Sequence, residues 1–214
     1  MIEFYSFLWH NTRIAKYLQE YFMFKRIFFA VSLPEEIKRE LSVIKEDLKN
    51  ELKKGVKWVE EENMHITLLF LGKVREDRVN EIISEAEKIR INPFSVLLKE
   101  ITYIPPDKKR AKMIWAKGES KELSFLYGEL EDKVAPHQQS KNGKDFIPHI
   151  TLGRIRSWEF RSMPLSEIPE IGQELEMSFK INSFNLMESK LTKNGPVYEN
   201  LREFVLQKGS MYQL

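Results

Sequence analysis

The tetrapeptide His-Ile-Thr-Leu occurs twice in this chain, at 65–68 and at 149–152, and this repeat constrains the fold more than any other feature. The copies start 149 − 65 = 84 residues apart. At average residue usage, His-x-Thr-Leu is expected at roughly one position in ten thousand, so two copies indicate a duplicated element. In a β-strand, the His and Thr side chains lie on one face and the Ile and Leu side chains on the other. Two such strands side by side would bring two imidazoles and two hydroxyls to one place.

A second, weaker repeat supports the duplication. Residues 91–94 and 181–184 share the pattern Ile-Asn-x-Phe and lie 181 − 91 = 90 residues apart. Helix and strand patterns are interleaved along the chain without the regular alternation of a doubly wound parallel fold. We therefore expect an α+β fold of two pseudo-symmetric lobes, each a small antiparallel sheet backed by helices, with the motif strands lining the cleft between the lobes.

Apolar periodicity and turn residues place the individual elements. Helices are predicted over 34–52, 75–90 and 119–134, and the first of them has an apolar stripe of Ile37, Leu41, Ile44, Leu48 and Leu52. Strands are predicted over 26–32, 57–60, 65–71, 94–104, 111–117, 147–155, 175–181, 184–190 and 197–206. We expect Gly72 to end the first motif strand and residues 135–145 to form a loop. The prolines between 157 and 172 predict turns with at most a short helix there.

Residues 1–22 form an aromatic-rich stretch with apolar residues near helical spacing. They lack a basic leader, and charged residues interrupt any secretory apolar core. We interpret them as an N-terminal extension, helical or disordered, that is either an added helix or lies upstream of a natural start at Met23; a membrane-surface helix is a third reading. We expect residues 23–214 to form a single bilobal domain. No run approaches the length of a membrane span, and we expect no membrane partner.

Composition excludes several kinds of site. The chain has no cysteine, which removes disulfides, thiolate nucleophiles and cysteine-ligated zinc and fits a cytoplasmic protein. The net charge of +2 gives no general argument for nucleic-acid binding, so any basic surface for RNA must be local. Two groups of basic residues could form such a surface. The run from Lys108 to Lys112 is more simply a solvated turn, whereas the arginines Arg154, Arg156 and Arg161 follow the second motif and lie nearer the expected cleft.

The paired motifs suit acid–base chemistry on a phosphoester, although a lone histidine on a strand is more often structural. An unperturbed histidine titrates near pH 6.5, so one imidazole can take a proton from water while the other protonates the leaving oxygen. We expect a bell-shaped pH–rate profile with both limbs in the histidine range. Thr67 and Thr151 share the faces of His65 and His149 and could donate hydrogen bonds to an anion between them. A zinc or iron site would need a third histidine or a carboxylate, so we expect no metal and no cofactor.

Paired His-x-Thr motifs resemble the two-histidine phosphoesterase superfamily, and the flanking residues are similar to its RNA 2′,3′-cyclic phosphodiesterase family, also called 2′-5′ RNA ligases. The matching pieces are residues 23–30, 33–34, 57–59, 63–72, 114–116, 146–154 and 195–198. The resemblance implies a two-lobed α+β fold with a cleft active site. It also implies metal-independent hydrolysis of a terminal RNA 2′,3′-cyclic phosphate to a 2′-phosphate. When a 5′-hydroxyl replaces water, the reverse-type reaction joins RNA ends through a 2′-5′ bond.

The resemblance also implies roles for individual residues. His65 would be the proton donor, His149 the proton acceptor, and Thr67 and Thr151 would hold the phosphate. The motifs are nearly symmetric, so the residues alone do not say which histidine is the acid.

Contacts outside the motifs are less defined. Many family members have Arg where this chain has Ile147, so Arg154 is the remaining candidate for a phosphate contact, although strict alternation points it away from His149. Phe70 and Tyr198 are candidates to stack a base, as are Trp58 and Trp115, but Phe70 and Trp115 sit in apolar strands that suggest core positions.

The expected partners are RNA ends, tRNA-like or other short RNA, and the chain is expected to be a monomer. Two alternatives stay open. One is a phosphodiesterase for 2′-5′ oligonucleotides or small cyclic nucleotides. The other is a module that binds RNA ends without turnover, although simple binding does not require two titratable groups.

Overall fold

The computed structural model describes residues 24–52, 54–134, 146–155, 157–193 and 195–207. The predictions made for residues 1–22, for the loop at 135–145 and for Arg156 fall outside this part of the chain. Its strands are β1 Phe24–Ser32, β2 Val56–Trp58, β3 His65–Arg75, β4 Phe94–Ile104, β5 Met113–Glu119, β6 His149–Ile155, β7 Glu174–Ile181, β8 Ser183–Thr192 and β9 Gly195–Val205. Its α-helices are α3 Glu35–Glu51, α4 Glu76–Ala86, α5 Lys121–Val134 and α6 Ser157–Ser162, and short 3₁₀ turns are η1 Glu61–Asn63, η2 Lys108–Arg110 and η4 Leu165–Glu167.

The strands form an antiparallel sheet in the order β7-β4-β5-β6-β3-β1-β8-β9, with β2 paired to β6. The sheet consists of two similar four-stranded halves that lie next to each other. In each half a motif strand, β6 or β3, pairs with β5 or β1, and two further strands follow outward. The halves meet at the motif strands, where Ile66 pairs with Ile150. The predicted α+β fold with two pseudo-symmetric halves is therefore confirmed, and a strand pair across the middle joins the two sheets.

The weaker repeat also falls on equivalent strands of the two halves. Phe94 begins β4, which pairs with β5, and Phe184 lies near the start of β8, which pairs with β1. Both phenylalanines are buried. The Ile-Asn-x-Phe pattern thus marks the start of equivalent strands in the two halves.

The central strand β1 has a fully apolar middle because it is covered on both faces. Residues 27–31 are all buried, with Phe29 completely inaccessible. Burying one such side chain contributes about 1.5–3 kcal/mol. Strand β1 pairs with motif strand β3 along its whole length and with β8 on its other side, so the core holds the first motif in place.

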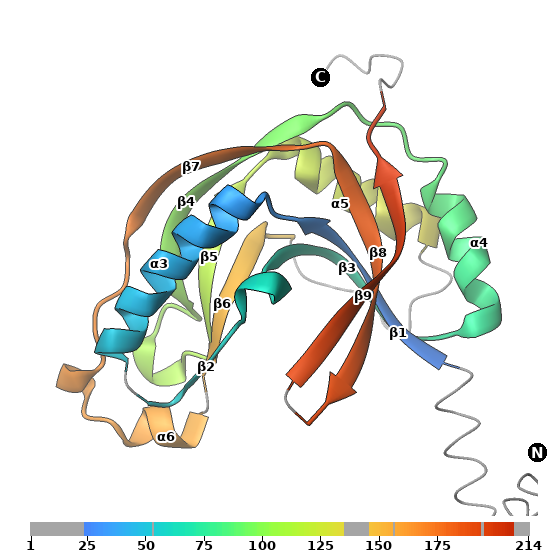
Figure 1. The fold of residues 1–214 in the computed structure, drawn as a ribbon. Helices are drawn as coiled ribbons and strands as arrows, with labels where there is room; N and C mark the ends of the chain where they lie inside the picture. The colour runs from blue at the N-terminus through green and yellow to red at the C-terminus, as the bar shows by residue number, and fades with distance from the viewer. Residues whose placement is uncertain (1–23, 53, 135–145, 156, 194, 208–214) are drawn as a thin grey trace, which may run out of the picture.

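Helices cover one face of the sheet and leave the other face open for the motif histidines. Figure 1 shows α3 lying across the half that contains β4, β5 and β6, while α4 lies beside the half that contains β1 and β3. Helix α5 contacts both β3 and α4. The apolar residues of the motifs face these helices, and Ile66, Leu68, Ile150 and Leu152 are all buried.

Helix α3 differs in one respect from the expected stripe. Ile37, Leu41 and Leu48 are buried as predicted, but Ile44 is only partly buried and Lys45 takes its place in the core at 4% exposure. Pro34 precedes the helix, and Glu35 and Glu36 in its first turn complement the dipole. A buried lysine in an apolar stripe is costly unless its ammonium is hydrogen-bonded.

One other expectation about an element needs correction. Strand β3 does not end at Gly72 but continues to Arg75. Gly72 has φ 77° and pairs with Ile27 at a register shift, so its left-handed backbone bends the strand without ending it. The segment after β6 agrees with the prediction of at most a short helix: it contains the six-residue helix α6, and Phe160 of this helix is buried.

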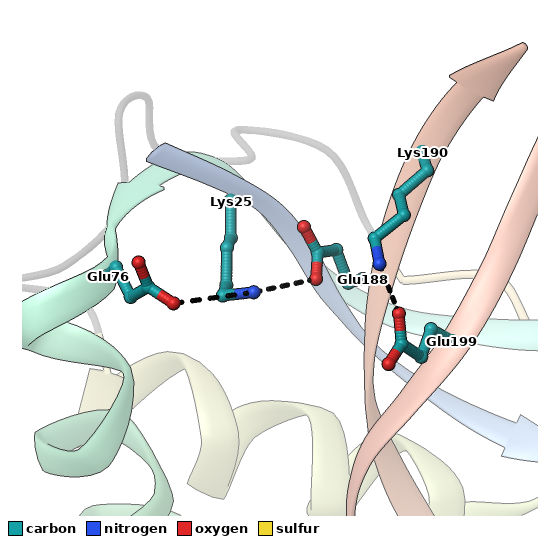
Figure 2. A network of polar contacts seen from close by, with 5 residues as sticks. All are labelled: Lys25, Glu76, Glu188, Lys190 and Glu199. Carbon is teal, nitrogen blue, oxygen red and sulfur yellow. Dashed lines mark hydrogen bonds and ion pairs between the residues drawn. The ribbon is translucent and has the colours of Figure 1, made fainter. Parts of the chain in front are cut away.

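An ion-pair network fastens the far end of β1 to its neighbours. Lys25 donates to Glu188 of β8 at 2.9 Å and lies 3.6 Å from Glu76 at the start of α4. Figure 2 shows Lys25 between these two carboxylates, with Lys190 and Glu199 forming a second pair across β8 and β9. Glu188 is 8% exposed, so its ion pair with Lys25 is partly desolvated.

None of the described helices is long and apolar enough to cross a membrane.

Candidate active site

Each motif strand has a β-bulge directly after its His-x-Thr sequence. In β3, Thr67 pairs with Ala30 and Leu69 with Phe29, so Leu68 has no partner in β1. In β6, Thr151 pairs with Trp115 and Gly153 with Ile114, so Leu152 has no partner in β5. A bulge adds one residue to one strand and reverses the alternation beyond it.

The bulges decide which side chains reach the open face. Before each bulge, His and Thr lie on the open face and Ile lies in the core. Beyond it, the residue five positions after each histidine is turned to the open face: Phe70 in β3 and Arg154 in β6, both exposed. The expectation that strict alternation points Arg154 away from His149 is therefore wrong. Phe70 is 41% exposed, so its assignment to the core is also wrong.

The two motifs lie side by side in opposite directions. Because Ile66 pairs with Ile150 in an antiparallel ladder, each histidine lies next to the threonine of the other motif. All four side chains line one cavity of about 110 Å³. Its other lining residues are Lys57, Trp58, Val59, Glu60, Asn63, Arg154, Gly195, Pro196 and Tyr198. The structure places six of the candidate residues, His65, His149, Thr67, Thr151, Arg154 and Tyr198, around this cavity, while Phe70 lies outside its lining.

Both imidazoles are oriented in the same way. His65 Nδ1 lies 2.8 Å from the carbonyl oxygen of Asn63, and His149 Nδ1 lies 2.7 Å from that of Ile147. A carbonyl can only accept, so each Nδ1 carries a proton and donates it. In the neutral ring the other nitrogen, Nε2, is then an unprotonated base. The Thr67 hydroxyl is 3.1 Å from His65 Nε2 and donates to it in this tautomer.

Different aromatic groups pack against the two histidines. The His65 ring contacts the Phe28 and Tyr198 rings, with centroids 5.2 and 5.1 Å away, and Phe28 in turn lies against Phe70. His149 stacks on Trp115 with centroids 3.5 Å apart and 16° between the planes. Trp115 is half-buried on the open face, so its role is to support a histidine, which the sequence alone did not show.

Both histidines have a lowered pKa. Burial is the main cause for His65 and, together with the charges of Arg154 and His149, brings its pKa to about 4 against the opposing hydrogen bond to Asn63. Burial also lowers the pKa of His149, with Arg154 adding to the effect and the Ile147 carbonyl opposing it. The charge of Arg154 lowers the pKa of both rings, so Arg154 and the two histidines interact electrostatically. In the empty cleft both imidazoles are neutral at pH 7.

Lys57 is a site residue that the search for motifs missed. It lies in β2, paired with Arg154 of β6, and its side chain reaches the cavity beside Gly195. The signals in the sequence were its place in the short predicted strand before the first motif and in the family-like piece at residues 57–59. Together, Lys57 and Arg154 place two cations beside two hydroxyls and two imidazoles, a donor set that suits an oxyanion.

The basic run in the β4–β5 turn has a structural role. Lys108 donates to the carbonyl of Ile168 at 3.1 Å and pairs with Glu170, and Lys109 donates to the carbonyl of Met163 at 2.8 Å. These bonds fasten the segment around α6 to the turn. Only Arg110 and Lys112 of the run are exposed there.

The cavity does not offer the ligands of a typical metal site. Within the described ranges, no group of three or more His, Cys, Asp or Glu side chains is placed to hold a metal ion. The cations Arg154 and Lys57 line the same cavity as both imidazoles. Two positive charges that line the same cavity favour the binding of an anion there.

Comparison with known families gives a decisive match. The model of the family described as "LigT like Phosphoesterase" matches the chain twice, over residues 31–115 and 116–198. The chain belongs to the LigT-like phosphoesterase family. The first match contains His65 and the second His149, which confirms both the predicted superfamily and the duplication inferred from the repeated motif.

Individual relatives agree with this assignment. The chain is 34% identical over 189 residues to the RNA 2′,3′-cyclic phosphodiesterase of Thermotoga maritima, covering 86% of this chain and 97% of that protein. It is 31% identical over 179 residues to the enzyme of the same name from Methanocaldococcus jannaschii, covering 84% of this chain and 99% of that one. The crystal structure of the protein TT0787 from Thermus thermophilus has a TM-score of 0.74 at 27% identity and covers 86% of this chain and 98% of that one. The prediction that the chain is a phosphodiesterase is confirmed.

Proposed function

We propose that this LigT-like phosphoesterase hydrolyses the terminal 2′,3′-cyclic phosphate of RNA to a 2′-phosphate. The observation that carries the proposal is the pair of imidazoles whose Nδ1 atoms are tied to backbone carbonyls, with both rings lining one cavity of about 110 Å³. This arrangement fits an acid and a base acting on the same phosphate. The names of the relatives supply the substrate class.

In this reaction His149 takes a proton from water as the water oxygen attacks phosphorus. The bond from phosphorus to the 3′ oxygen breaks, and His65 gives its proton to that oxygen, leaving the phosphate on the 2′ oxygen. One histidine gains a proton and the other loses one, so exchange with solvent restores the enzyme. Each proton transfer contributes about 10²–10⁴-fold to the rate.

The assignment of acid and base is supported by the asymmetry of the cleft. The leaving oxygen belongs to the terminal nucleoside, so the base of that nucleoside must lie on the side of the acid. Tyr198, Phe28 and Phe70 cluster on the His65 side, where a base could stack on the exposed part of Phe70 or Tyr198. Arg154 takes the position equivalent to Phe70 on the His149 side. His65 is therefore the acid, and the attacking water enters beside His149.

Binding of the anion prepares His65 for this role. In the empty cleft its pKa of about 4 keeps it neutral. A phosphodiester anion between the rings adds a negative charge close to both, which raises both pKa values. The threonine hydroxyls and the cations Arg154 and Lys57 then hold the non-bridging oxygens and stabilise the charge that develops in the transition state.

The proposal includes metal independence and the reverse-type reaction. Two imidazoles, two hydroxyls and two cations supply the acid, the base and the anion-binding groups, so each step has a protein group to perform it. Ligation requires only that a 5′-hydroxyl replaces water beside His149, with the 2′,3′-cyclic phosphate again as the acceptor. We also propose that the protein acts as a cytoplasmic monomer on RNA ends, such as those of tRNA fragments; sedimentation equilibrium tests its mass in solution.

The function is tested with an RNA oligonucleotide that ends in a 2′,3′-cyclic phosphate, incubated with the enzyme in EDTA. The expected product gains the mass of one water and shows the ³¹P signal of a 2′-phosphomonoester. His65→Asn and His149→Asn should each lower the rate at least about 10²-fold, because each removes one proton-transfer group. A product with a 3′-phosphate, loss of activity in EDTA, or full activity in either variant would contradict the proposal.

A further inference from the structure

Lys45 is a charged residue at a position where the helix calls for an apolar one. It lies four residues after Leu41 on the buried stripe of α3 and is 4% exposed. Its ammonium donates to the carbonyl of Val59 at 3.0 Å. Removing an ammonium from water is expensive, and an apolar side chain of the same length would fill the core at lower cost. The position of the ammonium therefore suggests a role other than stability.

Val59 connects Lys45 to the second motif. Its amide donates to the carbonyl of Leu152 at 2.9 Å. Leu152 is the bulged residue of β6 and has no partner residue in β5. This bond continues the pairing of β2 with β6 by one residue, on the edge of β6 opposite β5. Just before Val59, the three pairs of β2 with β6 run from Val56–Ile155 to Trp58–Gly153, so β2 and Val59 together hold the whole bulged segment.

The same segment leads to the first motif. After Val59 the chain forms η1, which contacts α3, and reaches Asn63, whose carbonyl orients His65. The stretch from Val56 to His65 therefore supports the site at both ends. Its first residues, in β2, hold the bulge that turns Arg154 into the cleft, and the Asn63 carbonyl near its last residue orients the His65 ring. The Lys45 ammonium is bonded to the backbone between them.

We propose that Lys45 is a positioning residue for the phosphate site, whose ammonium fixes Val59 and, through it, the Leu152 bulge that directs Arg154 into the cleft. Lys45 does not touch the substrate. Without its hydrogen bond, the Val59 carbonyl would be left unpaired in the core and the segment would shift to find another donor. Arg154 and Lys57 would then lose their fixed places beside the two histidines.

The first test needs no substrate, so it stands apart from the proposed function. The chain has four histidines, and their ring signals can be assigned by single substitutions and titrated by NMR. In Lys45→Met, the pKa values of His65 and His149 should rise because Arg154 withdraws its charge, as they should in Arg154→Ala. In Lys45→Met combined with Arg154→Ala they should rise no further than in Arg154→Ala alone. Unchanged values in Lys45→Met would overturn the proposal.

The matched control is Lys49→Met. Lys49 lies one turn further along α3 and pairs with Glu46 at the surface. This variant removes the same charge from the same helix without touching Val59, and it should leave both histidine titrations and the activity at wild-type values. A change as large as that in Lys45→Met would show that helix charge, rather than the bond to Val59, is responsible.

The kinetic test rests on the proposed function and uses the cyclic-phosphate RNA. Lys45→Met should raise KM about tenfold with a smaller fall in kcat, because the misplaced groups bind the phosphate in both ground and transition states. Lys45→Gln keeps a neutral donor and should recover part of this loss; if it recovers none, the ammonium acts through its charge and the proposal fails. Lys45→Met should fold with a thermal midpoint close to that of wild type, because the loss of the bond to Val59 is offset by the removal of a desolvated charge, and its failure to fold would make Lys45 a structural residue. A wild-type enzyme inactive on this RNA would refute the proposed function and leave the NMR result intact.

Discussion

At the scale of single residues, the two halves of the cleft differ most at the fifth position after each histidine. Phe70 and Arg154 occupy equivalent places beyond equivalent bulges, yet one is aromatic and the other cationic. A symmetric cleft would bind a cyclic phosphate in two orientations. In the proposed reaction, the arginine on one side and the aromatic ring on the other would select the orientation that places the nucleoside beside His65.

Arg154 is therefore expected to contribute to binding through both its charge and its planar shape. Arg154→Ala should lower kcat/KM about 10- to 100-fold, in the range of a lost charge-assisted hydrogen bond. Arg154→Lys should recover only part of this, because an ammonium cannot form two parallel bonds to a phosphate. Steady-state kinetics on the cyclic-phosphate RNA measures both. Arg161→Ala removes an exposed arginine of α6 and serves as the control; an equal loss there would mean that overall charge is responsible.

The pH dependence follows from the lowered histidine pKa values. In the proposed reaction His149 must be neutral and His65 protonated, so kcat/KM should be greatest between their two pKa values in the free enzyme. Both lie below 6.5, with His65 at about 4. The kcat/KM profile should be a bell centred below pH 6.5, at the acid edge of the expected histidine range. The kcat profile should lie at higher pH, since the bound anion raises both values. Discontinuous assays from pH 3.5 to 9 measure kcat and kcat/KM separately. Profiles of the two constants with the same pH optimum would contradict this account.

At the scale of elements, the bulges of β3 and β6 decide what the sequence could and could not reveal. Strand β4 was predicted at its observed limits, and the placing of His, Thr, Ile and Leu on two faces was correct, because alternation is a property of one strand. A bulge depends on how a strand registers with its neighbour, which a single strand does not encode. Arg154 and Phe70 were misplaced for this reason, whereas Trp115 follows the regular alternation of β5 and was assigned to the core only because its strand is apolar. Lys57 was missed because β2 became part of the site only through its pairing with β6.

Gly153 tests the close approach of β2 to the bulge. A Cβ atom on Gly153 would lie 2.7 Å from Val56 Cγ1 and 3.2 Å from the Trp58 ring, so β2 would have to move. Gly153→Ala should cost about 1–3 kcal/mol of stability and lower the activity, because Lys57 moves with β2. Gly128→Ala in α5 is the matched control, since nothing lies within 4 Å of its Cβ, and it should stabilise the helix by about 0.5–1 kcal/mol. Urea unfolding and the RNA assay give both quantities, and a Gly153→Ala enzyme that behaves as the control does would contradict the role assigned to β2.

At the scale of the whole molecule, the pairing of β3 with β6 at Ile66 and Ile150 joins two half-sheets, and the candidate active site lies on that junction. In the proposed reaction the acid and the base come from different halves, so the reaction would require both halves in register. The described helices cover the opposite face, and the histidines lie half-buried on the open one. Catalysis needs imidazoles that are desolvated enough to shift in pKa and accessible enough to meet a substrate, and this placement provides both.

The same desolvation should make the fold less stable in mild acid. The pKa of His65 is about 4 in the folded protein and near 6.5 in the unfolded chain, so between these values the unfolded state binds more protons. The stability linked to the neutral ring is therefore complete above pH 6.5 and is lost as the pH falls toward 4. Since the ring is partly open to solvent, we expect this to amount to about 1 kcal/mol between pH 6.5 and pH 5. Carboxylates titrate in the same direction below pH 5, so wild type must be compared with the His65→Asn, His149→Asn double variant, which keeps an N–H donor at each position. The free energy of unfolding of wild type minus that of the double variant, measured in urea, should fall as the pH is lowered from 7 to 5. A value that stays constant over this range would show that the histidines are not desolvated as the cleft geometry requires.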